Sequence, residues 1–378
     1  FTVHVSPEIL YKTHYGAFVI ELNGPAYADE NVIGHTIPEY AVRSLDYTVN
    51  LDALQRAWES KLEPVFPCRI KTSDVTPETY SHDERPILSA SIKTAKPKVL
   101  IPVFPGTNCE YDTARAFEKA GAEAETVVIR NISAGDIEES VNYFERAVRQ
   151  SQIIMIPGGF SGGDEPEGSG KFITAFFRNP KIKEAVHDLL KNRDGLMLGI
   201  CNGFQALIKT GLVPFGEITD MTSDTPTLTF NKIGRHISRV VRTRMVSATS
   251  PWALSPSVLD SRIHLVPVSH GEGRIVISKE LAQKLFAAGQ VFTQYVDENG
   301  IPSISEPDNP NGSLFAIEGL TSPDGRVLGK MGHSERTMGQ DANGASVDLI
   351  KNIAGNPLTN PTENSCQNIF QAGVAYFS

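Results

Sequence analysis

The sequence contains little cysteine and no paired cysteine motif. Its 378 residues include only four cysteines, and no two of them form a CxxC pair. So sparse a set is not typical of a disulfide framework, and the spacing does not indicate a zinc site. We therefore expect a protein of a reducing compartment, which here means a cytoplasmic location. The cysteines are Cys68, Cys109, Cys201 and Cys366.

Long hydrophobic runs and clustered positive charge are also missing. No apolar run approaches the length of about 18 residues that predicts a transmembrane helix, and the first residues lack the basic and apolar segments of a signal peptide. The formal net charge is −9 and no Lys/Arg block stands out. We therefore expect neither nucleic acid nor a membrane as partner. The chain begins with Phe1 rather than methionine, and we expect a processed product or the cut end of a longer polypeptide.

Residues 1–95 form a first block with few strong signals. FVIEL at 18–22 predicts a strand, and the apolar spacing in 51–66 predicts a helix that Pro64 ends. The block contains no catalytic signature. We expect it to be the tail of a domain whose remainder is missing, followed by a linker at 93–98.

Residues 96–378 form a second block in which apolar strands alternate with helices. This alternation predicts an α/β fold with an open, mostly parallel sheet and helices on both faces. Active sites in such sheets lie outside the carboxyl ends of the strands. After about residue 212 the pattern becomes irregular and richer in strands. We expect strands at 98–106, 125–130, 153–159 and 195–200, and helices at 111–122, 136–150, about 170–191, 201–211, 341–353 and 366–377.

The stretch GICNGFQ, residues 199–205, has the form of a nucleophile elbow with cysteine as the nucleophile. Gly199 and Gly203 flank Cys201 because side chains there would collide in so sharp a turn. A helix that begins at Cys201 would favour a thiolate through its N-terminal dipole, and the N–H of Asn202 would face a developing oxyanion. Taken alone, the motif fits an inert buried cysteine equally well.

The stretch MGHSER offers a base for that cysteine. His333 and Glu335 are two residues apart, so in an extended chain both side chains point to the same side. His333 would take and give the proton, and Glu335 would hold the imidazole tautomer. An isolated HxE is more typical of a surface ion pair, but beside the elbow it indicates a triad.

The glycine-rich stretch PGGFSGGDEPEGSG, residues 157–170, follows a predicted strand. It does not match a nucleotide-binding P-loop, because Glu165 occupies the position of the first glycine and Phe172 follows Lys171. Backbone N–H groups of Gly159 or Phe160 would instead complete an oxyanion hole with Asn202. The later glycines fit a flexible surface loop.

Together, PGGFSGGD, GICNGFQ and GHSER resemble the class I, or triad, glutamine amidotransferases. The resemblance implies that Cys201 attacks the side-chain amide of glutamine, that His333 is the acid and base, and that Glu335 orients it. Ammonia leaves and a glutamyl thioester is hydrolysed. Gln205 and the backbone of Gly158, Gly159 and Phe160 would contact the glutamine substrate.

Further stretches narrow the resemblance. FPGTNCEYDTARAFEKAGA, VSHGEGRIV and the closing NIFQAGVAYFS are similar to formylglycinamidine ribonucleotide synthase, a ligase of purine biosynthesis, in its large single-chain form. This implies a glutaminase domain that delivers ammonia to a synthase domain of the same polypeptide. It also implies no cofactor in this fragment, with ATP and Mg²⁺ bound by the missing synthase portion. The PHPER form of the family reads GHSER here, so Gly332 and Ser334 replace both prolines and we expect a less rigid loop.

Cys109 has no glycine frame and is expected to be a neutral thiol, and His270 is expected to be structural. Arg274 and Arg336 are expected to form ion pairs or to contact glutamine or the synthase. The alternative functions are a cysteine hydrolase or deglycase-like enzyme with the same elbow, and a non-catalytic interaction domain. The first of these would need neither Gln205 nor the strand-rich segment at about 215–330.

Overall fold

The chain divides into two compact units. The computed structural model describes residues 1–24, 32–65, 77–84, 88–161, 169–253, 263–340, 346–348 and 367–378. The units comprise Phe1–Arg69 and Ile70–Ser378. The division lies ahead of the predicted linker because the later part of the first sequence block belongs to the second unit and packs within it. The ring of Tyr80 stacks on Phe286 at 4.1 Å, and the N–H of Ala90 donates to the carbonyl of Tyr376 at 2.9 Å.

The first unit has a small sheet with the strand order β2-β1-β3-β4. The helix predicted from residue 51 is confirmed, although it ends before Pro64; the Asn50 side chain caps it by accepting the N–H of Ala53 at 3.1 Å. The strand predicted at 18–22 is wrong, because this segment pairs with no strand and its side chains are exposed. The elements are β1 (Thr2–Val3), α1 (Pro7–Leu10), β2 (Gly34–His35), β3 (Ala41–Arg43), β4 (Thr48–Asn50) and α2 (Leu51–Ser60).

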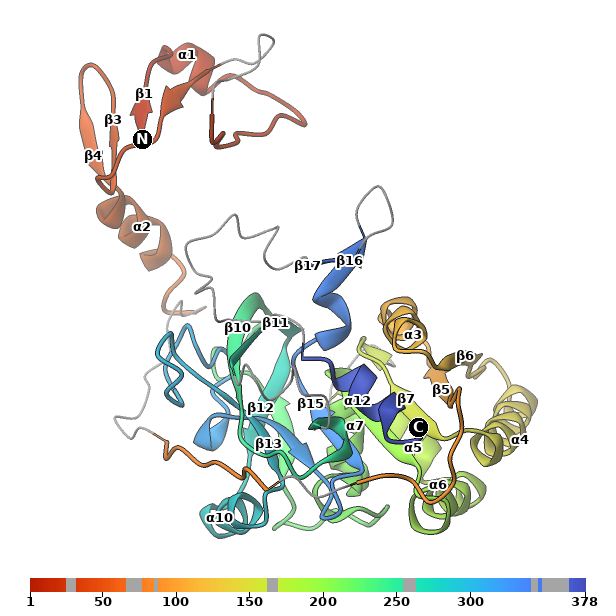
Figure 1. Cartoon of the computed structure of the whole chain (residues 1–378). Coiled ribbons are helices and arrows are strands. Elements are labelled where there is room, and N and C mark those ends of the chain that lie inside the picture. Colours follow the sequence, from red (N-terminus) through yellow and green to blue (C-terminus); the bar gives the residue numbers. More distant parts are fainter. Residues whose placement is uncertain are drawn as a thin grey trace. The chain divides into compact units, whose positions relative to one another are not determined.

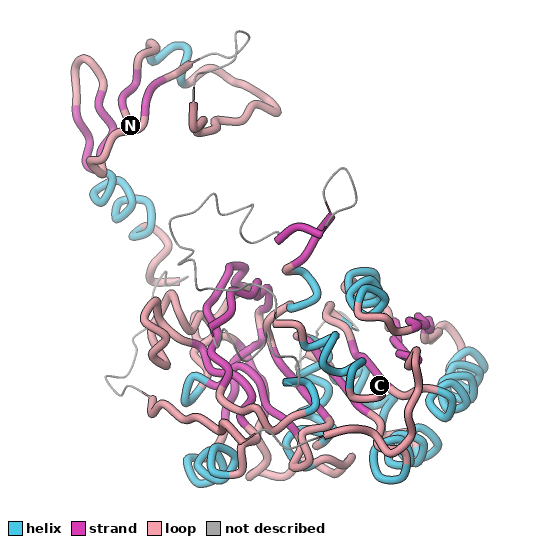
Figure 2. The backbone as a smooth tube through the Cα atoms, viewed as in Figure 1, coloured by secondary structure: helices cyan, strands magenta, loops and turns pink. Residues whose placement is uncertain are grey.

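The described part of the second unit is built around a nine-stranded sheet, with the order β11-β10-β13-β14-β15-β8-β7-β5-β6 (Figures 1 and 2). The half from β15 to β6 is parallel, and the half from β11 to β15 is antiparallel. Only β10 and β14 run against the common direction, so the predicted mostly parallel sheet is confirmed. The strands are β5 (Lys98–Val103), β6 (Glu123–Val128), β7 (Ile153–Ile156), β8 (Leu196–Ile200), β10 (Ile237–Met245), β11 (Ile263–His270), β13 (Val291–Tyr295), β14 (Ile317–Thr321) and β15 (Val327–Lys330).

Smaller elements accompany this sheet. The pairs β9 with β12 and β16 with β17 form separate two-stranded sheets. The helix predicted at 341–353 is wrong where the chain is described, because 346–348 pair as a strand with β16; the rest of that range, like Cys68 and Cys366, lies outside the described residues. The bounds are β9 (Thr227–Phe230), β12 (Glu272–Val276), β16 (Met338–Gln340), β17 (Ser346–Asp348), and the 3₁₀ turns η2 (Pro251–Ala253), η3 (Leu314–Ala316) and η4 (Ser334–Arg336).

Helices cover both faces of the parallel half. The strand order, with the right-handed crossovers usual between parallel strands, places α3 on one face and α4 to α6 on the other, where α7 packs against α5. Phe117 of α3 packs edge-on against Phe370 of α12, and Phe144 of α4 packs against Phe176 of α5. The helices are α3 (Glu110–Lys119), α4 (Ala134–Gln150), α5 (Lys171–Phe177), α6 (Pro180–Asn192), α7 (Asn202–Thr210), α8 (Leu212–Phe215), α10 (Lys279–Ala287) and α12 (Ile369–Ala375). None of the described helices is long and apolar enough to cross a membrane.

The helix predicted at about 170–191 is two helices, α5 and α6. Asn179 and Pro180 cause the break. The Asn179 side chain accepts the N–H of Lys181 at 3.0 Å, and Pro180 takes the first position of the new helix, where a missing N–H does no harm.

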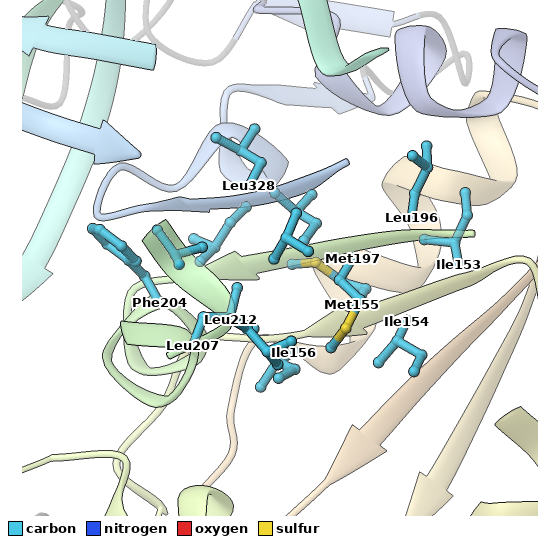
Figure 3. Packing of buried hydrophobic residues seen from close by; sticks show 14 of the residues in the cluster. Ile153, Ile154, Met155, Ile156, Leu196, Met197, Phe204, Leu207, Leu212 and Leu328 are labelled. Carbon is cyan, nitrogen blue, oxygen red and sulfur yellow. The ribbon is translucent and has the colours of Figure 1, made fainter. Parts of the chain in front are cut away.

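One part of the core lies between the parallel strands and α7. Figure 3 shows the buried side chains of β7, β8 and α7 packed against one another, among them Met155, Met197 and Phe204. Each fully buried side chain of this size contributes about 1.5–3 kcal/mol through removal of apolar surface from water. This packing fixes the strand ends from which the site is built.

The carboxyl ends of β5 and β7 lie side by side at a topological switch point. The chain leaves β5 for the outer strand β6 and leaves β7 in the opposite direction for β8. The two loops that follow are tied together, since Thr107 pairs with Gly159 and the N–H of Asn108 donates to the carbonyl of Gly158 at 3.2 Å. Crevices at such points are where open α/β sheets bind their ligands.

Candidate active site

Cys201 lies at the carboxyl end of β8 and is the N-cap residue of α7. Its φ of 53° and ψ of −106° are strained for a residue with a side chain. The N–H of Cys201 donates to the carbonyl of Lys330 at 2.9 Å, which ties the turn to β15. Its thiol donates to the carbonyl of Ser269 at 3.7 Å. The strand, sharp turn and helix of a nucleophile elbow are therefore confirmed at the predicted residues.

The glycines beside Cys201 allow a close approach of α7 to the sheet. A Cβ on Gly203 would lie 2.0 Å from the carbonyl oxygen of Ile156, and one on Gly199 would lie 2.6 Å from Leu207 and 2.7 Å from the backbone of Gly203. Real Cβ atoms do not come so near to backbone atoms. The two glycines thus bring the start of α7, with its N–H groups, down onto the carboxyl ends of β7 and β8.

His333 and Glu335 form a buried pair. Nδ1 of His333 and Oε1 of Glu335 are 2.6 Å apart. The approach is made by a 3₁₀ turn, η4, and not by the predicted extended chain. The N–H of His333 donates to the carbonyl of Pro267 at 2.9 Å and so fixes the residue against β11.

Gly158 is the point where the site residues converge. A Cβ at this position would lie 2.7 Å from Cε1 of His333, 3.0 Å from Sγ of Cys109 and 3.4 Å from Cβ of Cys201. These three side chains come from three different loops, after β15, β5 and β8. The structure therefore brings the predicted nucleophile and base together, and the missing side chain of Gly158 leaves the space between them.

The charges of this cluster favour a protonated imidazole. Burial by itself lowers the pKa of His333, but the Glu335 carboxylate and the thiols of Cys109 and Cys201 outweigh it, and the pKa lies well above its ordinary value. Burial raises the pKa of Glu335, but the adjacent His333 outweighs it and the pKa is lowered. An ionised carboxylate beside a protonated imidazole is the arrangement of a triad.

Cys109 belongs to the site although it lacks a glycine frame. Its buried Sγ lies 3.9 Å from Nδ1 of His333 and donates to Oδ1 of Asn108 at 3.2 Å. Cys109, His333 and Glu335 bring possible metal-ligand atoms within 4.8 Å of one another. The direct hydrogen bond between His333 and Glu335 already engages two of those atoms. The set therefore fits a base held by a carboxylate better than an ion.

The predicted oxyanion donors are reduced from three to two. The N–H of Phe160 is already engaged, because the loops after β5 and β7 pair and it donates to the carbonyl of Gly106 at 2.8 Å. Gly159 lies opposite Thr107 in this pairing, where the two residues exchange no hydrogen bond, and its φ is 151°. The N–H of Gly159 makes no hydrogen bond to any described residue. Gly159 and the N–H at the start of α7 are the donors that fit the role.

Gln205 is buried and both ends of its amide are engaged. Oε1 accepts from Nδ2 of Asn202 at 2.8 Å, and Nε2 donates to the carbonyl of Glu272. Oδ1 of Asn202 in turn accepts the N–H of Ser161 at 3.2 Å. In this structure Gln205 therefore holds Asn202 and the glycine-rich loop. Direct contact of Gln205 with a substrate stays a prediction, and residues 162–168 of the loop lie outside the described residues.

His270 lies at the end of β11, near enough to His333 to feel its charge. Burial, then the charges of His333 and His236, lowers the pKa of His270 to about 3. Nδ1 lies 3.0 Å from Oδ1 of Asn231, and Nε2 is buried without a partner among the described residues. A neutral histidine held by an asparagine is consistent with the structural role expected for it.

Sequence reasoning missed the buried residues behind the His333 loop. Lys330 and Glu318 are both fully buried and form an ion pair of 3.3 Å. The sequence carries a weak signal for them, since each stands in an otherwise apolar strand. Arg336, expected in an ion pair, makes one with Asp112 at 3.0 Å, and Arg274 donates to the carbonyl of Phe230 at 3.0 Å.

Residues 96–377 match the family described as the CobB/CobQ-like glutamine amidotransferase domain. The chain is also similar to curated proteins named phosphoribosylformylglycinamidine synthase subunit PurQ. The one from Methanococcus maripaludis is 35% identical over 289 residues, which cover 75% of this chain and 98% of that protein. The one from Dehalococcoides mccartyi is 36% identical over 242 residues, which cover 64% of this chain and 86% of that protein.

Among solved structures, the chain is similar to one described as the structure of PurLQS from Thermotoga maritima. The TM-score is 0.50 and the identity 23%, over 75% of this chain and 100% of the other. At this identity the likeness supports the fold alone. It agrees with the sheet and helices described above.

Proposed function

Because the chain belongs to the CobB/CobQ-like glutamine amidotransferase domain family, we propose that it hydrolyses glutamine to supply ammonia to formylglycinamidine ribonucleotide synthase in purine biosynthesis. One observation carries the chemistry: Cys201, on a strained turn at a helix start, meets the buried His333–Glu335 pair around the space left by Gly158. This arrangement suits acyl transfer through a thioester.

In this proposal Cys201 is the nucleophile. Its thiolate, formed by proton transfer to His333, attacks the side-chain amide carbon of glutamine. The imidazolium of His333 then gives the proton to the departing nitrogen, which leaves as ammonia. Water, deprotonated by His333, attacks the thioester and releases glutamate. Glu335 holds Nδ1 of the ring, so Nε2 remains for these proton transfers.

The negative oxygen of each tetrahedral intermediate needs donors that are already in place. The N–H of Gly159 lies in the loop after β7, and the N–H of Asn202 lies at the start of α7, directly after β8. Removal of one such donor in other acyl-transfer enzymes costs about 3–4 kcal/mol of transition-state stabilisation. The Gly158 and Gly159 backbone and Gln205 are the proposed environment of the glutamine.

We further propose that the chain is part of a larger single polypeptide that also contains the synthase. The PurQ relatives are separate subunits, and this chain carries additional residues before the matched region. The first unit exposes large apolar side chains, including Phe18 at 89% and Trp58 at 77%, and α2 buries none of its residues. Such exposed apolar surface is typical of a region that packs on further protein. The synthase portion is the proposed occupant.

ATP and Mg²⁺ belong, in this proposal, to that synthase portion and not to this chain. The glutaminase chemistry described above uses a thiol, an imidazole and a carboxylate. None of its steps needs ATP or Mg²⁺. Glutamine is the substrate of this chain, and the synthase domain receives its ammonia.

The test is mass spectrometry of the chain after incubation with a glutamine-analogue chloroketone. We expect one adduct, on Cys201, that glutamine suppresses and that Cys201→Ser abolishes. Cys109→Ser is the matched control, and its adduct should still form on Cys201. An adduct on Cys109, or labelling that other amides and esters suppress but glutamine does not, would contradict the proposal and favour a cysteine hydrolase.

A further inference from the structure

The loop that carries His333 is held from behind by two fully buried charged residues. Lys330 ends β15, and Glu318 lies on the neighbouring antiparallel strand β14. Nζ of Lys330 lies 3.3 Å from Oε1 of Glu318, and both side chains have no exposed surface. Neither residue takes part in the chemistry proposed above.

This ion pair contacts the residues on both sides of His333. Oε1 of Glu318 accepts the N–H of Gly332 at 2.6 Å. Nζ of Lys330 donates to the carbonyl of Gly332 at 2.8 Å and to the hydroxyl of Ser334 at 3.1 Å. The peptide before His333 and the side chain after it are therefore both fixed by buried, charge-assisted hydrogen bonds, which are the stronger kind.

The network continues to Gln367, ahead of α12, and to Thr243 of β10. The hydroxyl of Ser334 donates to Oε1 of Gln367 at 2.5 Å, so its proton and a lone pair are both engaged. Nε2 of Gln367 donates to the hydroxyl of Thr243 at 3.2 Å, and Oε2 of Glu318 accepts from Thr293. Satisfied buried networks of this kind specify one geometry.

Lys330 also links the base to the nucleophile. Its carbonyl accepts the N–H of Cys201 at 2.9 Å, while its ammonium holds Gly332 and Ser334. One residue thus fixes the strained turn of Cys201 through its backbone and the His333 loop through its side chain. A shift of Lys330 would change the distance between the two reacting groups.

The identities of Gly332 and Ser334 match this arrangement. A Cβ on Gly332 would come 3.0 Å from Nζ of Lys330 and 3.1 Å from Oε1 of Glu318. Proline at 332 would lack the N–H that Glu318 accepts, and proline at 334 would lack the hydroxyl that Lys330 contacts. In place of the two prolines, the loop has hydrogen bonds to Glu318 and Lys330.

Stability alone does not explain the pair. A buried ion pair is often no more stabilising than well-packed apolar side chains of similar volume, because both charges lose their hydration. We propose that Lys330 and Glu318 are positioning residues for the general base. They hold the Gly332–Ser334 loop so that His333 faces Cys201. The inference rests on the proposed function, in which His333 serves Cys201.

The test is the rate at which iodoacetamide alkylates Cys201 in the full 378-residue chain, followed by peptide mass spectrometry at about pH 6 and about pH 8.5. Wild-type chain should react at the lower pH because His333 pairs with the thiol. In Lys330→Met we expect that rate to fall by about tenfold to a hundredfold, as misplacement by about 1 Å does in other enzymes. An unchanged rate in a folded Lys330→Met chain would overturn the proposal.

The double variant Lys330→Met with Glu318→Leu separates positioning from folding. It removes both charges, so the melting temperature should recover relative to Lys330→Met, which leaves Glu318 unpaired. The alkylation rate at about pH 6 should stay low, because Gly332 has still lost its partners. Recovery of rate and melting temperature together would show a merely structural role and overturn the proposal.

A milder variant covers the case in which Lys330→Met does not fold. Ser334→Ala keeps the ion pair and removes one of its contacts, and we expect a rate at about pH 6 lowered by roughly threefold. Ser250→Ala removes a buried hydroxyl that bonds Gly325 at 2.7 Å, away from this loop, and should leave the rate unchanged. Equal rates in the two would contradict the proposal. Glutamine protection of the wild-type chain, measured separately, reports on the proposed function alone.

Discussion

Oε1 of Glu335 lies 2.6 Å from Nδ1 of His333, and both side chains are buried. The carboxylate and the imidazole shift each other's pKa in opposite directions, upward for His333 and downward for Glu335. The contact is therefore strongest in the pH range where one group is protonated and the other is not. This range governs both the stability of the chain and the availability of the base.

Glu335→Gln should destabilise the chain in a pH-dependent way. The raised pKa of His333 stabilises the folded state below about pH 6.5, and this contribution is lost as pH rises through the folded pKa. The lowered pKa of Glu335 stabilises it above about pH 4.3, and this is lost as pH falls. We expect a difference in unfolding free energy of about 1.5–3 kcal/mol near pH 6 that shrinks at alkaline pH. Denaturation curves across pH measure it.

Glu138→Gln is the control, because Glu138 is an exposed residue of α4. It should change the unfolding free energy by less than about 0.5 kcal/mol at every pH. If the difference in unfolding free energy between wild type and Glu335→Gln stays constant across pH, the pair is not ionised.

Gly158→Ala should strongly slow the reaction of Cys201 with the chloroketone. The new methyl group would lie 2.7 Å from Cε1 of His333 and 3.4 Å from Cβ of Cys201, so the imidazole has to move. We expect the labelling rate to fall by at least about a hundredfold. Gly135→Ala is the matched control, since its methyl group would meet only Oγ of Ser133, at 3.8 Å. Normal labelling of Gly158→Ala would show that the base is not needed at this position.

The parallel half of the fold was predictable because local sequence patterns mark its strands and helix ends. The runs in β5, β7 and β8 are apolar at every position or nearly so, and Gly121 and Gly211 mark helix ends with positive φ. Cys201, His333 and Glu335 were predictable because a sharp turn needs glycines on both sides and because HxE spacing is short. Their meeting in space follows from the carboxyl ends of neighbouring parallel strands.

The predictions that failed depend on contacts between residues far apart in the sequence. The apolar run at 18–22 lacks a partner strand, so its propensity has nothing to pair with. Phe160 was one of two alternative oxyanion donors in its loop, and its N–H is engaged because the carbonyl of Gly106, far away in sequence, accepts it. Lys330 and Glu318 are opposite charges brought together only by the pairing of β14 with β15. No local pattern reports such contacts.

Two buried histidines should make the chain acid-labile. Burial, then the charge of Lys330, lowers the pKa of His264 to about 4, and burial, then His333, lowers that of His270 to about 3. A lowered folded pKa means that stability present above about pH 6.5 is lost as pH falls toward the folded value. Each group contributes up to about 1.4 kcal/mol per pH unit.

Between about pH 6 and about pH 4, His264→Gln should therefore reduce the slope of the unfolding free energy against pH. The reduction corresponds to about one proton fewer taken up on unfolding. Its ring nitrogens have no partner among the described residues, so the substitution removes no hydrogen bond there. His14→Gln, at an exposed position, should leave the slope unchanged. Equal slopes for wild type and His264→Gln would show that His264 is not buried in its neutral form.

Gln205 offers a choice between two roles that kinetics can separate. Its amide holds Asn202 and the carbonyl of Glu272, so we expect it to act by positioning the start of α7. In Gln205→Leu the maximal rate of chloroketone inactivation should fall about tenfold, while its half-saturation concentration stays within about twofold. Gln290→Leu is the control: it removes a buried amide that bonds the carbonyls of Pro214 and Thr321, remote from the site, and should change neither constant. A half-saturation concentration that rises with little change in maximal rate would instead show that Gln205 contacts the glutamine side of the ligand directly.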